Sequence, residues 1–182
     1  MKIAVSGSHK TGKSTLIGEL SDRLPGFELF DEPYWQLVEE GQLFSDPPTL
    51  EEYELQLERS VDDVVISEGD CLFERCPLDF LAYILVLDDS LRSDVERHLP
   101  SVREAVESLD LIVFVPIEEP DRMGDTDYPE LRRRVDEELR EIVMDDVFDL
   151  GIEVLEVTGP AGERARQVME LLGRKRDTDE HG

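Results

Sequence analysis

The sequence predicts an α/β fold in which a parallel sheet carries helices on both faces. Short apolar runs of strand length alternate along the chain with longer segments whose apolar residues repeat at helical spacing. The run at residues 111–115 contains no polar residue, which is typical of a central parallel strand covered on both faces. A loop with two glycines joins the first apolar run to the first helical segment. Together these features predict five parallel strands linked by helices.

The composition of the 182-residue chain narrows the class of protein. With 45 acidic and 19 basic residues the net charge is −26, which disfavours nucleic acid and anionic membranes as partners. The longest apolar run, residues 80–87, is too short to span a membrane. We therefore expect a cytoplasmic monomer or homodimer with no nucleic-acid or membrane partner. It should have a single domain at residues 1–173 and a disordered tail at residues 174–182.

Residues 7–15 fit the phosphate-loop pattern G-x-x-x-x-G-K-[ST] at every fixed position. The apolar run at residues 2–6 precedes them and a helical pattern at 16–24 follows, so strand, loop and helix come in the required order. Such a loop binds phosphate through main-chain N–H groups and the positive end of the helix. The pattern therefore predicts ATP binding by Gly7, Ser8, His9, Lys10, Thr11, Gly12, Lys13, Ser14 and Thr15.

Individual residues of this loop have separate expected roles. Gly7 and Gly12 let the backbone adopt positive φ, which turns successive N–H groups inward. Lys13 is expected to reach the β- and γ-phosphates of ATP, and the Ser14 hydroxyl is expected to hold Mg²⁺. The side chain of His9, at a variable position of the pattern, is expected to face solvent.

Two carboxylates follow the second strand, which we expect at residues 27–30. In open α/β sheets ligands bind beyond the carboxyl ends of the strands, the edge at which the phosphate loop also lies. Asp31 and Glu32 are thus candidates for a general base, and Glu32 is favoured because Pro33 fixes the adjoining backbone. The alternative is a solvated acidic turn.

The next segments supply candidates for binding a second substrate. Trp35, the only tryptophan, lies on a short helix after the second strand, and either the core or a substrate pocket suits it. After a loop at residues 41–48, Thr49 is a good N-cap for a long helix with Tyr53 on its apolar face. Gln56 flanks that face, where it would either contact substrate or lie exposed to solvent.

The third strand, expected at residues 71–73, is followed by Glu74 and Arg75. A carboxylate at the end of an apolar strand beside a phosphate loop is the expected second ligand of Mg²⁺, which makes Glu74 the candidate. Arg75 is expected to clamp a phosphate or a substrate oxygen, and its alternative role is a salt bridge to Asp79 or Asp31. Asp79, the one charged residue of the apolar helix that follows, also counts among the substrate-binding candidates.

Three consecutive arginines open the helix expected at residues 129–147, after an aperiodic loop at 116–127. Because helical residues are about 100° apart, one or two of them turn toward the nucleotide while another meets solvent. We expect a lid in which Arg132 contacts ATP and Arg133 neutralises phosphate charge during catalysis. Pairing of Arg133 with Glu137 along the helix is an equal alternative. The remaining elements are expected at residues 95–109 (helix), 111–115 (strand), 152–157 (strand) and 161–172 (helix).

With these motifs placed, the chain resembles the P-loop kinase group that includes deoxyribonucleoside kinases, thymidylate kinase and nicotinamide riboside kinase domains. It is most similar to the small bacterial AAA-domain ATPase and kinase-like proteins. The resemblance covers residues 7–172 and rests on the phosphate loop and on residues 31–34, 74–79 and 132–136. It implies a three-layer P-loop NTPase fold with strand order 2-3-1-4-5 and an arginine lid.

The resemblance also implies roles for single residues. In deoxyribonucleoside kinases a Glu-Pro pair supplies the base, and a Glu-Arg-Ser supplies a metal-linked carboxylate and a substrate-facing arginine. By that resemblance Glu32 is the base, Glu74 assists Mg²⁺ and Arg75 steadies the substrate, while Gln56 matches a glutamine that reads the nucleobase. Cys76 stands where those enzymes have serine, and the spacing of the lid arginines differs, so nucleoside specificity does not carry over.

The sequence thus predicts an ATP-dependent phosphotransferase that moves the γ-phosphoryl group to a small-molecule acceptor, a nucleoside or a nucleotide. ATP is the co-substrate and Mg²⁺ the cofactor. The alternatives are an ATPase that acts as a nucleotide-controlled switch and a module that binds nucleotide without turnover. A deep pocket lined by Trp35, Tyr53 and Gln56 would favour the kinase. The residues expected to carry catalysis are Lys13, Glu32, Arg75 and Arg133.

Overall fold

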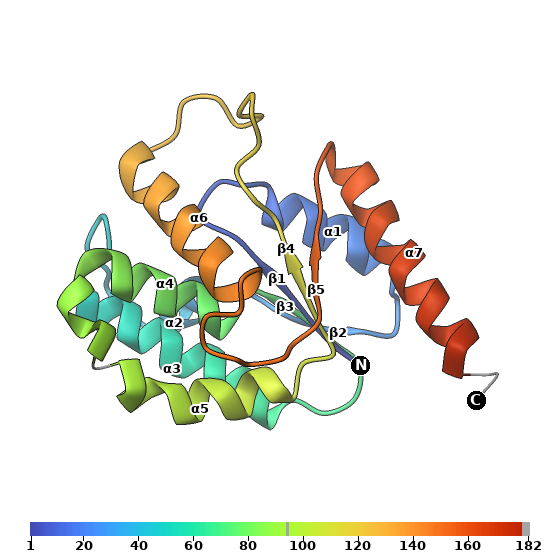
Figure 1. Cartoon of the computed structure of the whole chain (residues 1–182), viewed down its shortest axis with the longest axis horizontal. Helices are drawn as coiled ribbons and strands as arrows, with labels where there is room; N and C mark the ends of the chain where they lie inside the picture. The colour runs from blue at the N-terminus through green and yellow to red at the C-terminus, as the bar shows by residue number, and fades with distance from the viewer. Residues whose placement is uncertain (94, 180–182) are drawn as a thin grey trace.

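The computed structural model describes residues 1–93 and 95–179 and has a five-stranded parallel sheet at its centre (Figure 1). The strands lie side by side in the order β2-β3-β1-β4-β5, and every neighbouring pair is parallel. This confirms the predicted fold class and strand order. The strands are β1 (Lys2–Ser6), β2 (Glu28–Phe30), β3 (Cys71–Glu74), β4 (Leu111–Phe114) and β5 (Val154–Glu156).

The helices form a layer on each side of the sheet. Helices α1 and α7 cover one face and the other helices cover the opposite face, with α4 packed against both α3 and α6 (Figure 1). The helices are α1 (Lys13–Arg23), α2 (Pro33–Glu39), α3 (Leu50–Ile66), α4 (Pro77–Leu87), α5 (Val95–Glu107), α6 (Pro129–Val143) and α7 (Ala161–Asp179). A 3-10 turn at Asp89–Ser93 links α4 to α5.

Two hydrophobic cores fill the spaces between the layers, and the central strand β1 contributes to both. Ile3 and Val5 belong to the core under α1 and α7, whereas Ala4 belongs to the core under the larger helical layer. This division follows from the pleat, since successive side chains of a strand point to opposite faces. The same alternation turns Ser6 toward α4, where its hydroxyl contacts Asp79.

The N-terminus of α3 has a reciprocal cap that also holds the loop before it. Thr49 accepts a hydrogen bond from the Glu52 N–H, and the Glu52 carboxylate accepts one from the Thr49 N–H at 2.7 Å, as predicted for an N-cap at Thr49. Glu52 also accepts a hydrogen bond from the Ser45 N–H at 3.0 Å. One carboxylate therefore ties the loop at residues 41–48 to α3.

The C-terminal segment departs from the expected disordered tail. Helix α7 continues past Gly173 to Asp179, and residues 180–182 lie outside the described residues. Lys175 forms a salt bridge with Glu153 and donates to the carbonyl oxygen of Asp110, so this turn is attached to the sheet edge. Glycine in a helix costs only about 1 kcal/mol, which such contacts offset. Among the described residues, no helix combines the length and apolar character of a membrane span.

Candidate active site

The phosphate loop lies between β1 and α1 at the carboxyl edge of the sheet. Gly12, the N-cap of α1, has a φ of 91° and no side chain caps the helix. The first N–H groups of α1 are therefore open to an anion, which the helix dipole also attracts. Gly7 also has a positive φ, of 159°, as predicted, and a Cβ there would lie 2.5 Å from the Val115 carbonyl oxygen.

Two buried arginines from distant helices hold the carbonyl groups of this loop. Arg132 of α6 donates to the carbonyl oxygens of His9 and Lys10 at 3.0 and 2.9 Å. Arg164 of α7 donates to the carbonyl oxygen of Thr11 at 2.7 Å. These contacts fix the carbonyl side of the loop, while the N–H groups of Gly7 and His9 donate to Asp79 at 3.2 Å and to the Tyr83 hydroxyl group at 2.9 Å.

Arg164 was missed by the sequence analysis, although the sequence carries a signal for it. The residue falls on the apolar stripe of α7, three positions after Ala161 and four before Val168, where a charged side chain must find a buried partner. Its second partner is Glu118, which also accepts a hydrogen bond from the Gly159 N–H.

Lys13, the first residue of α1, is buried, and its side chain folds back onto the phosphate loop. Its ammonium group donates to the carbonyl oxygen of Ser8. Burial lowers the pKa of Lys13 to about 7, and the nearby positive charge of Arg75 acts in the same direction. The residue thus lies where a phosphate group at the loop would gain a strong charge-assisted partner.

The two residues expected to hold Mg²⁺ are in direct contact. The Ser14 hydroxyl donates to Oε1 of Glu74 at the end of β3. In phosphate-loop sites the protein supplies one or two oxygen ligands and the phosphates and water supply the others. Among the residues that the structure describes, no group of three or more His, Cys, Asp or Glu side chains is placed to hold a metal ion. The donor set fits a magnesium ion shared with phosphate.

Arg75 connects the phosphate loop with the second strand. Its Nε donates to Glu32 at 2.8 Å, and its Nη1 donates to the Gly7 carbonyl oxygen at 2.7 Å and to Asp79 at 3.2 Å. The residue is buried and has a φ of 90°, a backbone conformation that costs a residue with a side chain on the order of 1–3 kcal/mol. The ion pair with Asp79 matches the alternative role given to Arg75, and the pair with Glu32 was not foreseen.

Glu32 carries a negative charge at neutral pH. Burial by itself would raise the pKa of this carboxyl group, but the charges of Arg75 and Lys13 and the hydrogen bond from Arg75 lower it below its ordinary value. The residue is the N-cap of α2, and Pro33 occupies the first position of that helix, as the predicted turn requires.

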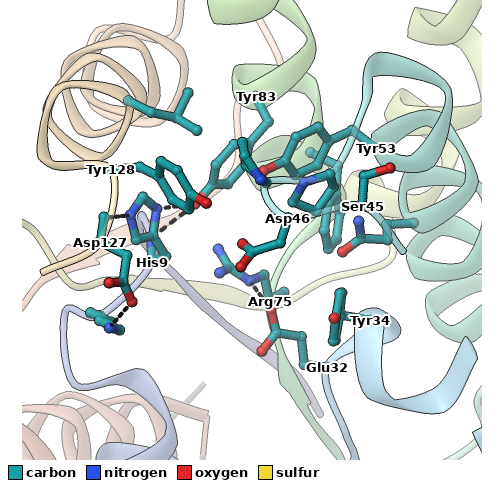
Figure 2. Close-up of a pocket in the computed structure, with 16 residues that line it drawn as sticks. His9, Glu32, Tyr34, Ser45, Asp46, Tyr53, Arg75, Tyr83, Asp127 and Tyr128 are labelled. Atoms are coloured by element: carbon teal, nitrogen blue, oxygen red, sulfur yellow. Dashed lines mark hydrogen bonds and ion pairs between the residues drawn. The ribbon is translucent and has the colours of Figure 1, made fainter. Parts of the chain in front are cut away.

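A cavity of about 230 Å³ lies beside Glu32 and Arg75, which both line it (Figure 2). Tyr53 and Gln56 line it, as expected, and Gln56 is only 2% exposed, with Nε2 bound to the Glu52 carbonyl oxygen at 3.1 Å. Much of the wall is aromatic, and Tyr53 stacks on Tyr83 with 4.6 Å between ring centroids. The aromatic residues of the wall are Tyr34, Tyr53, Phe80, Tyr83 and Tyr128.

Trp35 does not line this cavity, in contrast to the expectation. Its side chain is 58% exposed and packs edge-on against Tyr34, which faces the cavity in its place. Neighbouring residues of a helix point about 100° apart, so only one of the two rings can face inward. Asp79 does not line the cavity either, because it is fully buried beneath the phosphate loop, where it accepts a hydrogen bond from the Gly7 N–H at 3.2 Å.

The lid arginines also differ from the expectation. Arg133 is exposed and pairs with Glu130 and Glu137, so it faces away from the phosphate loop and lines neither cavity. This is the helix pairing that the sequence left as an alternative. Arg132 is turned inward, but it contacts the carbonyl oxygens of the loop and Asp121, so in this arrangement it supports the loop from behind.

His9 does not simply face solvent. Its ring nitrogens contact the Tyr83 hydroxyl and the Asp127 carbonyl oxygen, both at 2.9 Å (Figure 2). The side chain thereby joins the phosphate loop to α4 and to the loop before α6.

A second cavity, of about 340 Å³, lies over the phosphate loop and shares lining residues with the first cavity. Its wall includes residues 9–15, Glu74 and Met123. His9, Lys10, Glu32 and Arg75 line both cavities. A group bound at the loop and a molecule bound among the tyrosines would therefore meet at Glu32 and Arg75.

Comparisons with known proteins place this geometry in a family. A model of the AAA domain family matches residues 2–164. A search of curated proteins gave no match. Among solved structures, deoxyadenosine kinase from M. mycoides superimposes with a TM-score of 0.68 at 17% identity, covering 96% of this chain and 99% of that one.

Two further structures have the same fold. Thymidylate kinase from Candida albicans has a TM-score of 0.63 at 18% identity, covering 96% of this chain and 91% of that one. Shikimate kinase from Acinetobacter baumannii has a TM-score of 0.60 at 14% identity, covering 96% and 93%. With its phosphate loop, its strand order and a family model that spans most of its length, this chain belongs to the AAA domain family and has the fold of the P-loop kinases.

Proposed function

We propose that this protein transfers the γ-phosphoryl group of ATP to a hydroxyl group of a small molecule, a nucleoside or a nucleotide. The observation that carries the proposal is the position of Glu32 in the lining of both cavities. A phosphotransferase needs this arrangement, because the donor phosphate and the acceptor hydroxyl must meet in line beside a proton acceptor.

The cavity over the phosphate loop is assigned to ATP. Its γ-phosphate would be held by the N–H groups of the loop and by Lys13, whose pKa an adjacent phosphate would raise again. Ser14 and Glu74 would hold Mg²⁺, which supplies charge neutralisation for the β- and γ-phosphates. Arg75 lies at the junction with the second cavity and would steady the transferred group.

The cavity among the tyrosines is assigned to the acceptor. The acceptor oxygen forms a bond to the γ-phosphorus while the bond from that phosphorus to the bridging oxygen breaks, and ADP leaves with the electron pair. Glu32 takes the proton of the hydroxyl group. Its lowered pKa makes it a weak base, so most of the rate must come from positioning and charge neutralisation.

The structural neighbours support a kinase over an ATPase switch. The three neighbours described above are kinases, and their names give deoxyadenosine, thymidylate and shikimate as acceptors. An ATPase switch needs room only for water beside the phosphate. The acceptor cavity of about 230 Å³ is much larger than that.

The substitution Glu32→Gln tests the proposal. We expect turnover of ATP with its acceptor to fall by roughly a hundredfold or more, because a general base contributes about 10²–10⁴ in rate. The affinity for ATP should change little. ATP consumption would be measured against a panel of nucleosides, nucleotides and vitamin ribosides, and ATP binding by calorimetry.

The matched control is Asp31→Asn, which removes the neighbouring carboxylate, an exposed one. This variant should keep wild-type turnover. Full activity in Glu32→Gln would refute the role of Glu32 as base. ATP consumption that no acceptor accelerates would favour the switch, and ATP binding without turnover in the wild type would favour the binding module.

A further inference from the structure

The acceptor cavity carries an excess of negative charge. Its lining includes three carboxylates, those of Glu32, Asp46 and Asp127, and two cations, those of Lys10 and Arg75. His9 adds no positive charge, because burial above all, with nearby cations, lowers its pKa from an already near-neutral value. A ligand that enters the cavity therefore meets more acidic than basic groups.

Both cations are already neutralised. Arg75 forms ion pairs with Glu32 at 2.8 Å and with Asp79 at 3.2 Å, so two carboxylates face one guanidinium group. Lys10 forms an ion pair with Asp127 at 2.6 Å at the mouth of the cavity. A phosphate group on the acceptor would have to break one of these pairs to gain a positive partner.

Asp46 differs from the other carboxylates of the cavity because it forms no ion pair within residues 1–93 and 95–179. Burial first, and then the charge of the Asp46 carboxylate, raise the pKa of the Tyr128 hydroxyl group, which lines the same cavity. Figure 2 shows the Asp46 carboxylate pointing into the cavity, above the guanidinium group of Arg75. The loop that carries Asp46 is held to α3 by the contact between Ser45 and Glu52, so this position is fixed by the fold.

From this arrangement we infer that Asp46 selects the acceptor by charge, and that the acceptor is a neutral or cationic alcohol and not a phosphate ester or other anion. The inference rests on the proposed function, in which this cavity holds the acceptor, and it decides between the nucleoside and the nucleotide that the proposal left open.

The remaining contacts of the cavity suit such an acceptor. Arg75 has hydrogen bonds through Nε and Nη1 to residues of the described chain, and its guanidinium group points into the cavity, where Nη2 can donate to a neutral oxygen. Gln56 offers an amide, and the stacked rings of Tyr53 and Tyr83 offer a flat wall for a planar or a cationic group. None of these contacts requires an anion.

A phosphate ester is rejected on electrostatic grounds. A dianion beside an unpaired carboxylate is repelled, and the net charge of −26 adds repulsion over a longer range. We expect each nucleoside to bind the wild-type protein at least roughly tenfold more tightly than its own 5′-monophosphate, because a phosphate group placed beside a carboxylate is a juxtaposition of like charges.

The experiment compares matched pairs of ligands on three variants. Binding of nucleosides and of their 5′-monophosphates, together with nicotinamide riboside and its 5′-phosphate, is measured by calorimetry with a non-hydrolysable ATP analogue present. The variants are Asp46→Asn, Asp46→Lys and the control Glu58→Lys. Glu58 is an exposed residue of α3 that lines neither of the two cavities described above, so Glu58→Lys changes the net charge as Asp46→Lys does without changing the acceptor cavity.

We expect Asp46→Asn to weaken the discrimination against monophosphates and Asp46→Lys to reverse it, with a gain of roughly tenfold or more in monophosphate affinity. Glu58→Lys should leave the discrimination unchanged. Equal or tighter binding of a monophosphate by the wild type would overturn the inference. The inference would also be overturned if Asp46→Lys gained no affinity for any monophosphate. This holds as well where the wild type binds neither the nucleoside nor its monophosphate.

These outcomes separate the inference from the proposed function. Binding is measured without turnover. The experiment therefore tests the charge selection by Asp46 independently of whether the wild type transfers phosphate. If the predicted pattern of binding is found but no bound alcohol is phosphorylated, the selection is correct and the proposed reaction is wrong.

Discussion

His9 links three segments through its ring, and its hydrogen bonds assign the tautomer. The Asp127 carbonyl oxygen only accepts hydrogen bonds, so Nε2 carries the proton, and Nδ1 accepts from the Tyr83 hydroxyl. Burial, together with the charges of Arg75 and Lys13, lowers the pKa of His9 below 6.5. This imidazole therefore remains neutral at pH values where an unfolded chain binds a proton.

We predict that His9 titrates with a midpoint below 6.5 in the folded protein. Since the unfolded chain then binds more protons than the folded one, His9 contributes a loss of stability as the pH falls below 6.5. Proton NMR of the imidazole signals measures the midpoint, and the signal absent from His9→Gln identifies the residue. The free energy of unfolding of His9→Gln should also fall less than that of the wild type between pH 7 and pH 5.5. A midpoint at or above 6.5 would contradict this prediction.

Residues whose position is fixed by a local motif were predictable, and residues whose direction depends on packing were not. Ser14 and Glu74 lie in contact because a phosphate loop and the end of a neighbouring parallel strand must share one edge of the sheet. Trp35 and Arg133 were assigned to the site, but each is turned outward by the rotation of its helix about its axis. That rotation is set by contacts with distant segments, which periodicity alone does not give.

At the scale of elements, α6 and α7 each extend one arginine beneath the phosphate loop. Arg132 donates two hydrogen bonds to loop carbonyl oxygens and Arg164 donates one, and both side chains are buried. Their helices begin more than 100 residues after the loop in the sequence. The shape of the phosphate site therefore depends on the docking of the last third of the chain.

We predict that Arg132→Met and Arg164→Met each weaken ATP binding by roughly tenfold, because each removes charge-assisted hydrogen bonds worth about 1.5–3 kcal/mol from the loop backbone. Methionine keeps most of the side-chain length. The control is Arg133→Met, an exposed neighbour whose partners are Glu130 and Glu137, and its affinity for ATP should equal that of the wild type. Affinities would be measured by calorimetry below the melting temperature of each variant. Unchanged affinity in both buried variants would show that the loop holds its shape alone.

Element boundaries were less predictable than element types. Helix α6 ends at Val143 and Val147 is 51% exposed, although the apolar spacing continued to that residue. Asp146, with a φ of 49°, ends the helical path and accepts hydrogen bonds from the N–H groups of Leu150 and Gly151. A turn of this kind overrides periodicity because its hydrogen bonds satisfy backbone groups that a longer helix would leave open.

For the whole molecule, the strand order was predictable through the resemblance of the chain to the P-loop kinases, and the structure has that order. The acceptor cavity was predictable only in part. It is assembled from the loop that carries Asp46, from α3 and α4 and from Tyr128 just before α6. Neither the loop that carries Asp46 nor the loop that carries Tyr128 has a periodic pattern that fixes its position. The way these two loops come together determines which charged side chains line the cavity.

The acidic composition also acts at this scale. Basic residues number 19, so most of the 45 acidic residues have no cation to pair with, and the remaining charge repels itself across the folded surface. Salt screens this repulsion, since the Debye length falls from about 10 Å at 0.1 M to about 3 Å at 1 M. Surface ion pairs weaken as well, but each contributes only about 0–1 kcal/mol.

We therefore predict that the free energy of unfolding rises between 0.1 and 2 M KCl. A variant with Asp22→Asn, Glu39→Gln, Glu58→Gln and Asp62→Asn removes four exposed carboxylates on helices, and it should be more stable than the wild type at 0.1 M KCl and gain less from added salt. Urea titrations at each salt concentration measure both effects. If the variant and the wild type gained equally, the salt would be acting through hydration of apolar surface and not through charge screening. If both lost stability, ion pairs would dominate the surface in spite of the net charge.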